Sequence, residues 1–165
     1  MLRAVQSGWF SNDLTVFDTS GMTVARVVQA NWREAATLEV GEGRYKAHSK
    51  GWRSKQFVLE AEDGRVVSVA EKPSAWSNRF VFEQGGNRYD LEKESVWGGT
   101  FVIRREGVGR VGSVRSKGVF KRELMVDLPE EVPLEVRVFV MWLVGLLYRR
   151  ALSYAGAGGA AGGAG

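Results

Sequence analysis

The sequence predicts a mainly β protein: a closed antiparallel barrel of about twelve strands that encloses a C-terminal helix. Two observations carry this prediction. The first is a threefold repeat with a period of 43 to 45 residues, in which each unit contains four short alternating segments. The second is an abrupt change after Asp127, where alternation gives way to one apolar segment. Regular short strands close into a barrel or a sandwich, and a helix that is apolar all round needs an interior to fill.

Tryptophans mark the repeat. Trp9, Trp52 and Trp97 lie 43 and 45 residues apart. Each is followed twelve residues later by a glycine, and each has a second large aromatic residue 23 or 24 positions on. The glycines are Gly21, Gly64 and Gly109, and the aromatics are Trp32, Trp76 and Phe120. These landmarks divide the chain into three units, which run from Leu2 to about Arg44, from Tyr45 to about Arg88 and from Tyr89 to about Glu131.

Within each unit the hydrophobic pattern has period two. The runs "FVLEA", "RVVSVA", "RFVFEQ" and "RYDLEK" alternate and are rich in Val, Phe and Tyr, which is typical of strands. The breaks "EDG", "KPS" and "QGGN" separate them, and glycines there supply the positive φ of tight hairpins. Three units of four strands also describe a β-trefoil, which is the alternative fold. We expect the repeated tryptophans to pack in the core or between layers, because large aromatic side chains dominate core energetics.

The segment "EVRVFVMWLVGLLYRR" predicts a helix over about residues 132–152. Pro133 suits a first helical turn, acidic residues precede the apolar run, and Arg149 and Arg150 follow it, as the helix dipole favours. The eleven apolar residues from Val138 to Tyr148 span about 17 Å, which is short for a bilayer core of about 30 Å. We therefore interpret the helix as the plug of the barrel. A C-terminal membrane anchor with snorkelling arginines is the alternative.

The length of 165 residues suits one domain, which we place at residues 1–152. The remaining residues, 153–165, are rich in glycine and alanine and offer nothing to pack, so we expect a disordered tail. The N-terminus has no long apolar segment of the secretory type, which predicts a cytoplasmic protein.

Twelve strands followed by one apolar helix resemble the tubby C-terminal domain, with which the LURP-one-related proteins and the phospholipid scramblases are grouped. The likeness is to small bacterial members of that superfamily. It is carried by "FVLEAEDGRVVSVAEK" and by "VDLPEEVPLEVRVFVMWLVGLLYRR", and it covers the chain from Leu2 to Arg150. The resemblance implies a twelve-stranded barrel with a central helix and a lipid-associated function. No phosphoinositide-site motif of tubby matches these positions, and the cysteine-rich, proline-rich and calcium-site features of the scramblases are absent.

Signatures of an enzyme are scarce. The chain has no cysteine, and His48 is its single histidine, so neither a Cys–His pair nor a transition-metal cluster can be assembled. No helix is expected before Pro133, which excludes a phosphate loop between a strand and a helix. We interpret His48 as a packed or solvated strand residue. The sequence therefore predicts no catalytic residue, no metal site and no cofactor.

Basic residues are the one unevenly distributed feature of a chain whose net charge is +4. The segment 44–55 has five basic residues and no acidic one, and the segment 104–122 has seven basic residues against Glu106 alone. If these segments form loops at one end of the barrel, that end attracts anionic lipid. The candidate anion-binding residues are Lys46, Lys50, Arg53, Lys55, Arg115, Lys117, Lys121 and Arg122.

The sequence thus favours a non-enzymatic binding module that associates peripherally with anionic phospholipid membranes through basic loops. A barrel that binds a protein partner or a small ligand is the second hypothesis, and a tail-anchored membrane protein is the third. Nucleic acid is a less favoured partner, because neither exposed aromatic residues beside basic ones nor an element shaped for a groove can be identified.

Overall fold

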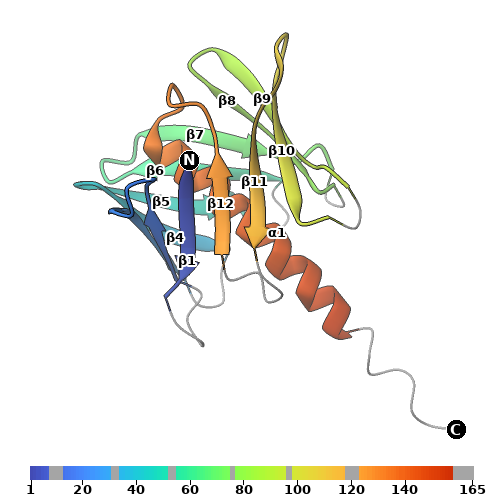
Figure 1. Ribbon diagram of the computed structural model, residues 1–165, viewed down its shortest axis with the longest axis horizontal. Coiled ribbons are helices and arrows are strands. Elements are labelled where there is room, and N and C mark those ends of the chain that lie inside the picture. Colours follow the sequence, from blue (N-terminus) through green and yellow to red (C-terminus); the bar gives the residue numbers. More distant parts are fainter. Residues whose placement is uncertain are drawn as a thin grey trace, which may run out of the picture.

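Twelve antiparallel strands and one helix make up the computed structural model (Figure 1). The structure describes residues 1–7, 13–30, 34–51, 55–74, 77–95, 98–117 and 123–157, with the backbone alone described for 151–157. The elements are β1 Leu2–Gln6, β2 Leu14–Phe17, β3 Thr23–Gln29, β4 Ala35–Val40, β5 Gly43–Ser49, β6 Gln56–Ala61, β7 Val66–Glu71, β8 Arg79–Gln84, β9 Asn87–Lys93, β10 Thr100–Arg105, β11 Gly109–Lys117, β12 Glu123–Asp127 and α1 Leu134–Ala157.

Every strand pairs with its neighbours in the sequence, and β1 pairs with β12, so the sheet closes on itself. The closing pair is antiparallel, with Arg3 opposite Met125 and Ala4 opposite Leu124. The junction of β7 and β8 is the shortest described, with only Ala70 opposite Phe82 and Glu71 opposite Val81. The prediction of a closed twelve-stranded barrel is confirmed. The β-trefoil alternative is wrong, because all twelve strands belong to one ring.

The three predicted units correspond to three successive groups of four strands: β1–β4, β5–β8 and β9–β12. The repeated glycines have closely similar backbones, with φ of +83° at Gly21, +82° at Gly64 and +98° at Gly109. Residues other than glycine rarely adopt such angles, so the periodic spacing of these glycines marks one recurring turn. All six repeated aromatic landmarks lie outside the described residues: Trp9, Trp32, Trp52, Trp76, Trp97 and Phe120.

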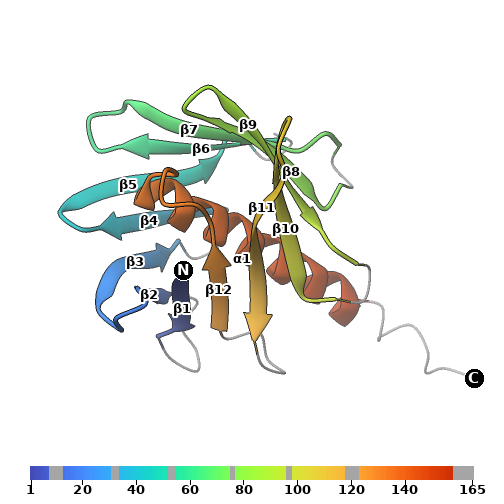
Figure 2. The ribbon, with the colours of Figure 1, turned by 45° about the horizontal axis from the view of Figure 1, so that its top comes forward.

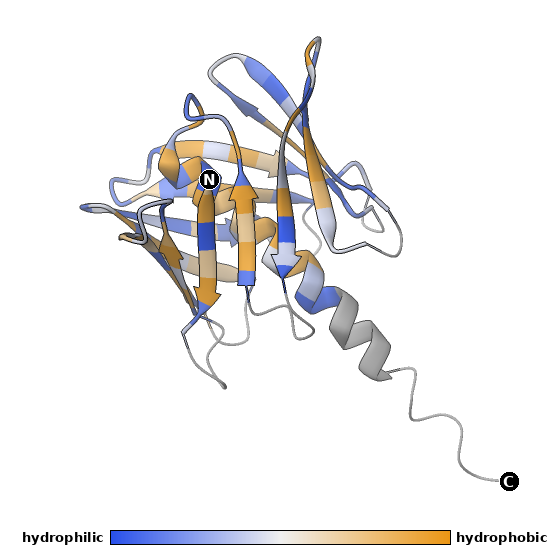
Figure 3. Cartoon of the chain, in the orientation of Figure 1, coloured by the Kyte–Doolittle hydropathy of each residue, from blue (hydrophilic) through white to orange (hydrophobic). Residues whose placement is uncertain are grey.

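Helix α1 runs through the barrel and projects beyond the strands at its C-terminal end (Figures 1 and 2). Seven consecutive residues, Val138 to Val144, are each 0% exposed. Such a segment needs no polar face, because strands surround it on all sides (Figure 3). The predicted plug is confirmed. The helix continues to Ala157, beyond its expected end, and 158–165 lie outside the described residues. Within the described chain, no helix is both long and apolar enough to cross a membrane.

Period-two alternation directs one face of each strand at the helix. Phe57, Phe80 and Trp142 form an aromatic group in the core, with ring centroids 5.3 Å apart for the first two and 6.0 Å apart for Phe57 and Trp142. The indole Nε1 of Trp142 donates a hydrogen bond to Gln29 Oε1 at 3.3 Å, so its polar atom is paired inside the barrel. Each large apolar side chain buried in this way contributes about 1.5–3 kcal/mol to folding.

The barrel has two different ends. We call one the turn end: it contains the connections 18–22, 41–42, 62–65, 85–86, 106–108 and 128–133, all of which the structure describes. We call the other the exit end, because α1 leaves the barrel there. It contains the connections 7–13, 30–34, 50–55, 72–78, 94–99 and 118–122. This assignment follows from the strand directions, since odd-numbered strands all run from the turn end to the exit end.

Candidate functional site

The predicted basic residues do not all lie in one region: some are at the exit end of the barrel and others are on its outer wall. Lys50 and Lys55 flank the β5–β6 connection at the exit end, and Lys117 ends β11 at the same end. All three are exposed. Arg53, Lys121 and Arg122 lie outside the described residues. The structure therefore places three of the predicted residues at one end of the barrel.

Lys46 and Arg115 belong to the outer wall rather than to a connection. Lys46 precedes the inward-facing Ala47 in β5, and Arg115 follows the inward-facing Val114 in β11, so both side chains point outward. Five strands separate β5 from β11 in either direction around the ring. Lys46 and Arg115 thus lie on opposite sides of the barrel and form no common patch with each other.

The turn end is strongly acidic. Its connections contain a single basic residue, Arg65, and seven acidic residues: Asp18, Glu42, Glu62, Asp63, Glu106, Glu130 and Glu131. The adjoining strand ends add Arg44, Arg88, Arg105 and Arg110, so the acidic excess belongs to the connections themselves. An anionic surface would be repelled by it.

The described connections of the exit end carry equal numbers of basic and acidic residues. Among the described residues of its connections, Lys50, Lys55 and Lys72 are basic, and Asp13, Glu34 and Glu94 are acidic. At the adjoining strand ends, Lys93 and Lys117 stand against Glu71 and Glu123. The two arginines at the end of the apolar helix, Arg149 and Arg150, add positive charge there. The sequence of the remaining residues in these connections contains four further basic residues and no acidic one. The two ends therefore differ in sign.

Four charged side chains meet where the helix leaves the barrel: Glu34, Lys72, Arg149 and Arg150, which we call the mouth cluster. Arg150 donates two hydrogen bonds to Glu34, from Nε to Oε1 at 2.7 Å and from Nη2 to Oε2 at 2.6 Å. The guanidinium also lies over the ring of Phe57, with Cζ 5.7 Å from the centroid. Lys72 Nζ lies 6.0 Å from the centroid of Phe80. The cluster thus rests on the aromatic group of the core.

Burial controls the electrostatics of this cluster. Lys72 is only 6% exposed, and burial lowers its pKa, with the positive charge of Arg150 acting in the same direction and Glu34 opposing both. Burial also lowers the pKa of Arg149, again against the opposing effect of Glu34. The mouth cluster as defined contains one carboxylate and three basic side chains, in a partly desolvated place.

Sequence reasoning missed the mouth cluster. Arg149 and Arg150 were interpreted as residues that complement the helix dipole, and Lys72 and Glu34 were not singled out. The available signal was the period-two pattern itself: Lys72 continues the inward-facing series of Ser68 and Ala70, and Glu34 stands two residues before the inward-facing Ala36. A charged residue on the inward face of a strand predicts a partner inside the barrel.

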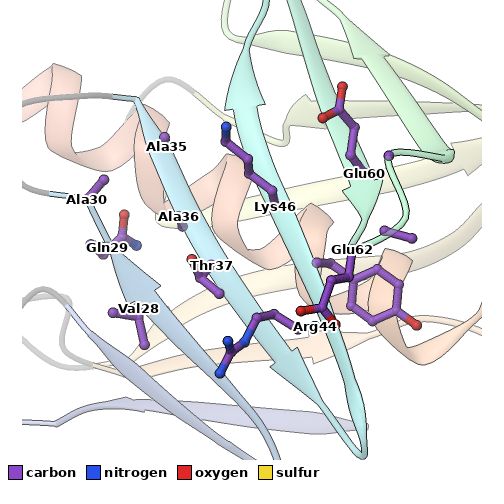
Figure 4. Close-up of a pocket in the computed structure, with 13 residues that line it drawn as sticks. Val28, Gln29, Ala30, Ala35, Ala36, Thr37, Arg44, Lys46, Glu60 and Glu62 are labelled. Atoms are coloured by element: carbon purple, nitrogen blue, oxygen red, sulfur yellow. The ribbon is translucent and has the colours of Figure 1, made fainter.

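A groove of about 480 Å³ lies on the outer wall over β3 to β6 (Figure 4). Val28, Thr37, Lys46 and Glu60 form a row across these four strands, each opposite the next. Ala30 and Ala35 provide a shallow apolar floor, and Arg44 and Glu62 stand at the other end. The groove therefore combines an apolar floor with charges of both signs, and Lys46 belongs to it rather than to the exit end.

His48, the single histidine, lies apart from the mouth cluster. His48 is half-buried on the outer wall of β5, and its Nε2 lies 3.3 Å from Glu60 Oε2, close enough for an ion pair although without hydrogen-bond geometry. Within the described ranges no three His, Asp or Glu side chains gather as a metal site requires. The interpretation of His48 as a strand residue is consistent with its position.

No protein-family model matches this chain, and neither a curated protein nor a solved structure shows a significant similarity to it.

Proposed function

We propose that this protein is a non-enzymatic binding module that associates with anionic phospholipid surfaces through its exit end. The observation that carries this proposal is the difference in charge between the two ends of the barrel. The turn end has seven acidic residues and one basic residue in its connections. The exit end presents exposed lysines, Lys50, Lys55 and Lys117, around the mouth cluster with its three basic side chains.

This asymmetry favours one orientation on a membrane. A basic residue near an anionic surface contributes about 1 kcal/mol of binding free energy, and the effect falls off within a Debye length. With the exit end toward the lipid, the acidic turn end stands on the far side of the barrel, where repulsion is screened. Helix α1 then points its C-terminal end at the bilayer (Figure 2). The opposite orientation would bring the acidic residues to the surface.

We further propose that the chain is related to the tubby C-terminal domains and their relatives. The support is architectural: a closed ring of twelve sequential strands around one C-terminal helix. Because fold alone does not determine function, the membrane proposal rests on the charges and not on this kinship.

Vesicle sedimentation tests the proposal. The wild-type protein should pellet with vesicles that contain phosphatidylglycerol and should stay in solution with phosphatidylcholine alone. The double variant Lys50→Glu and Lys117→Glu should lose at least about tenfold in affinity, since both residues lie at the exit end. The matched control, Arg65→Glu and Arg88→Glu, changes the same net charge with exposed residues of the turn end and should bind like wild type. Equal pelleting with both lipids, or none with either, removes the proposal.

The outer groove supports a second candidate function, the binding of a small ligand. Its volume of about 480 Å³ lies within the usual range of ligand sites, and its apolar floor is flanked by the charged side chains of Lys46 and Glu60. A fragment screen by NMR tests this candidate: shifts should concentrate at Ala35, Thr37 and Lys46. Shifts confined to the exit end would rule it out.

A further inference from the structure

The contact between Glu34 and Arg150 has the form that an arginine uses to hold a phosphate. Both carboxylate oxygens engage one edge of the guanidinium, through Nε and Nη2. Carboxylate and phosphate oxygens suit this fork equally, since each presents two acceptors in one plane. Glu34 therefore occupies a position on Arg150 that a phosphate group would fit.

The contact is also placed where it can be exchanged. The side chains of Arg150 and Glu34 are 32% and 35% exposed, so solvent and ligand reach the guanidinium edge. Ion pairs this exposed contribute little to stability, so phosphate groups presented at high local concentration by a lipid surface can compete with a single carboxylate. The backbone of Glu34 is held separately, because its carbonyl accepts a hydrogen bond from Ser49 N at 3.1 Å. The side chain of Glu34 can leave Arg150 without disrupting the β3–β4 connection.

The neighbours of Arg150 favour an incoming anion. Lys72 and Arg149 both stand close enough to Glu34 for its charge to affect their pKa values. When Glu34 swings away, Lys72, Arg149 and Arg150 all lose the nearby negative charge of Glu34. A phosphate bound to Arg150 replaces that negative charge.

We propose that Arg150 binds one phosphate group of an anionic lipid. In the absence of lipid, Glu34 occupies the guanidinium of Arg150 and competes with the phosphate until the phosphate displaces it. The inference rests on the proposed function and deepens it, because it turns a diffuse electrostatic attraction into a defined site. It assigns opposite roles to two residues of one ion pair: loss of Arg150 weakens binding, whereas loss of the Glu34 charge strengthens it.

A double-mutant cycle on the full chain tests the proposal. Affinities for phosphatidylglycerol vesicles are measured for wild type, Glu34→Gln, Arg150→Gln and the double variant, with Glu71→Gln as the control for removing one exposed acidic charge at the same end. Glu34→Gln should bind at least tenfold more tightly than wild type and clearly more tightly than Glu71→Gln. In the Arg150→Gln background, the gain from Glu34→Gln should shrink to that of Glu71→Gln. Equal gains in both backgrounds overturn the proposal.

Two further measurements keep the result interpretable. Arg150→Lys retains the positive charge but not the two parallel donors of the guanidinium. In the Arg150→Lys background, Glu34→Gln should therefore lose most of its gain in affinity, while the thermal midpoint stays near that of wild type. Inorganic phosphate tests whether the lipid binds through its phosphate group: at equal ionic strength, millimolar phosphate should weaken the vesicle binding of Glu34→Gln more than chloride does, and this difference should vanish in Arg150→Gln. Equal effects of phosphate and chloride on Glu34→Gln overturn the assignment of the headgroup phosphate to Arg150.

The proposed function and this inference fail differently. If wild type does not bind anionic vesicles, the proposed function fails, and the Arg150 side-chain Nε–Hε NMR signal of Glu34→Gln under added phosphate then decides the inference. A shift supports phosphate binding by Arg150, and an unchanged signal overturns it. If wild type binds but Glu34→Gln binds no better than Glu71→Gln, the proposed function stands and the inference fails.

Discussion

The hydroxyl of Tyr148 donates a hydrogen bond to the carbonyl oxygen of Gly99, which fastens α1 to the β9–β10 connection where the helix leaves the barrel. The ring of Tyr148 also meets that of Phe101 edge to face, with centroids 5.6 Å apart. Tyr148 is 7% exposed, and burial raises its pKa to about 12, because a phenolate there would lose its hydration. The helix exit therefore depends on a neutral phenol.

The stability of the protein should fall more steeply at alkaline pH than that of the variant Tyr148→Phe. The unfolded chain releases the phenolic proton near the ordinary pKa of 10.0, whereas the folded protein keeps it until about 12. The folded pKa is the higher one, so the contribution of Tyr148 is fully present below pH 10 and is lost as the pH rises to 12. The full loss is on the order of 3 kcal/mol in the free energy of unfolding. Urea unfolding followed by circular dichroism between pH 8 and 12 measures it.

The variant Tyr148→Phe serves as the reference because lysines also titrate in this range in both proteins. At neutral pH it should be less stable than wild type by about 1 kcal/mol, which is the usual value of a lost hydrogen bond. Parallel stability curves for the two proteins from pH 8 to 12 would contradict a buried neutral phenol.

Two glycine-to-alanine variants should change stability in opposite directions. A Cβ on Gly112 would lie 2.2 Å from the carbonyl oxygen of Asp127, a backbone atom held in the β11–β12 ladder, so Gly112→Ala should cost more than about 2 kcal/mol. A Cβ on Gly145 would meet only Leu124 Cδ1 at 3.9 Å, and alanine favours a helix, so Gly145→Ala should gain about 0.5–1 kcal/mol. Urea midpoints that rank these variants in the reverse order would show that the packing is different.

The aromatic group under the mouth cluster should dominate the stability of the core. Phe57 contacts both Phe80 and Trp142, and Arg150 lies over its ring, so Phe57→Ala removes all these contacts at once. Deleting a fully buried phenylalanine costs about 3–5 kcal/mol of unfolding free energy. The exposed Val66 provides the comparison, and Val66→Ala should stay within about 0.5 kcal/mol of wild type. Similar thermal midpoints for the two variants would place Phe57 outside the core.

Salt should separate membrane binding from folding. Raising the ionic strength from about 0.1 M to about 1 M shortens the Debye length from about 10 Å to about 3 Å and should abolish most binding to anionic vesicles. The thermal midpoint should change little, because the barrel is held by an apolar core that salt does not screen. Vesicle binding that persists at about 1 M salt would indicate apolar insertion rather than charge as the main driving force.

The fold was predictable because its signals are local. Alternation with period two, glycines at turn positions with positive φ and a helix without a polar face can each be recognised within a few residues. Closure of the ring was predictable from the helix, because a helix with eleven consecutive apolar residues must be buried on every side. The exact extent of α1 was not, because alanine and glycine at its end give no clear stop signal.

The site was only partly predictable because its parts are far apart in the sequence. Lys50, Lys55 and Lys117 could be assigned to connections from the repeat, and the structure places all three at the exit end. Glu34 and Arg150 are separated by 116 positions, and only closure of the barrel brings them together. Lys46 was grouped with the loops because it is close to Lys50 in the sequence, but it lies inside a strand and faces outward.

The order of the elements along the chain has a consequence for biosynthesis. The sheet is made first and the segment that fills it is made last, so a nascent chain on the ribosome carries twelve strands whose apolar faces have no partner until α1 emerges. During that interval the unfinished wall is the natural target of holdase chaperones. A gene truncated by a stop codon before Leu134 should therefore yield an aggregating, protease-sensitive product rather than a smaller barrel.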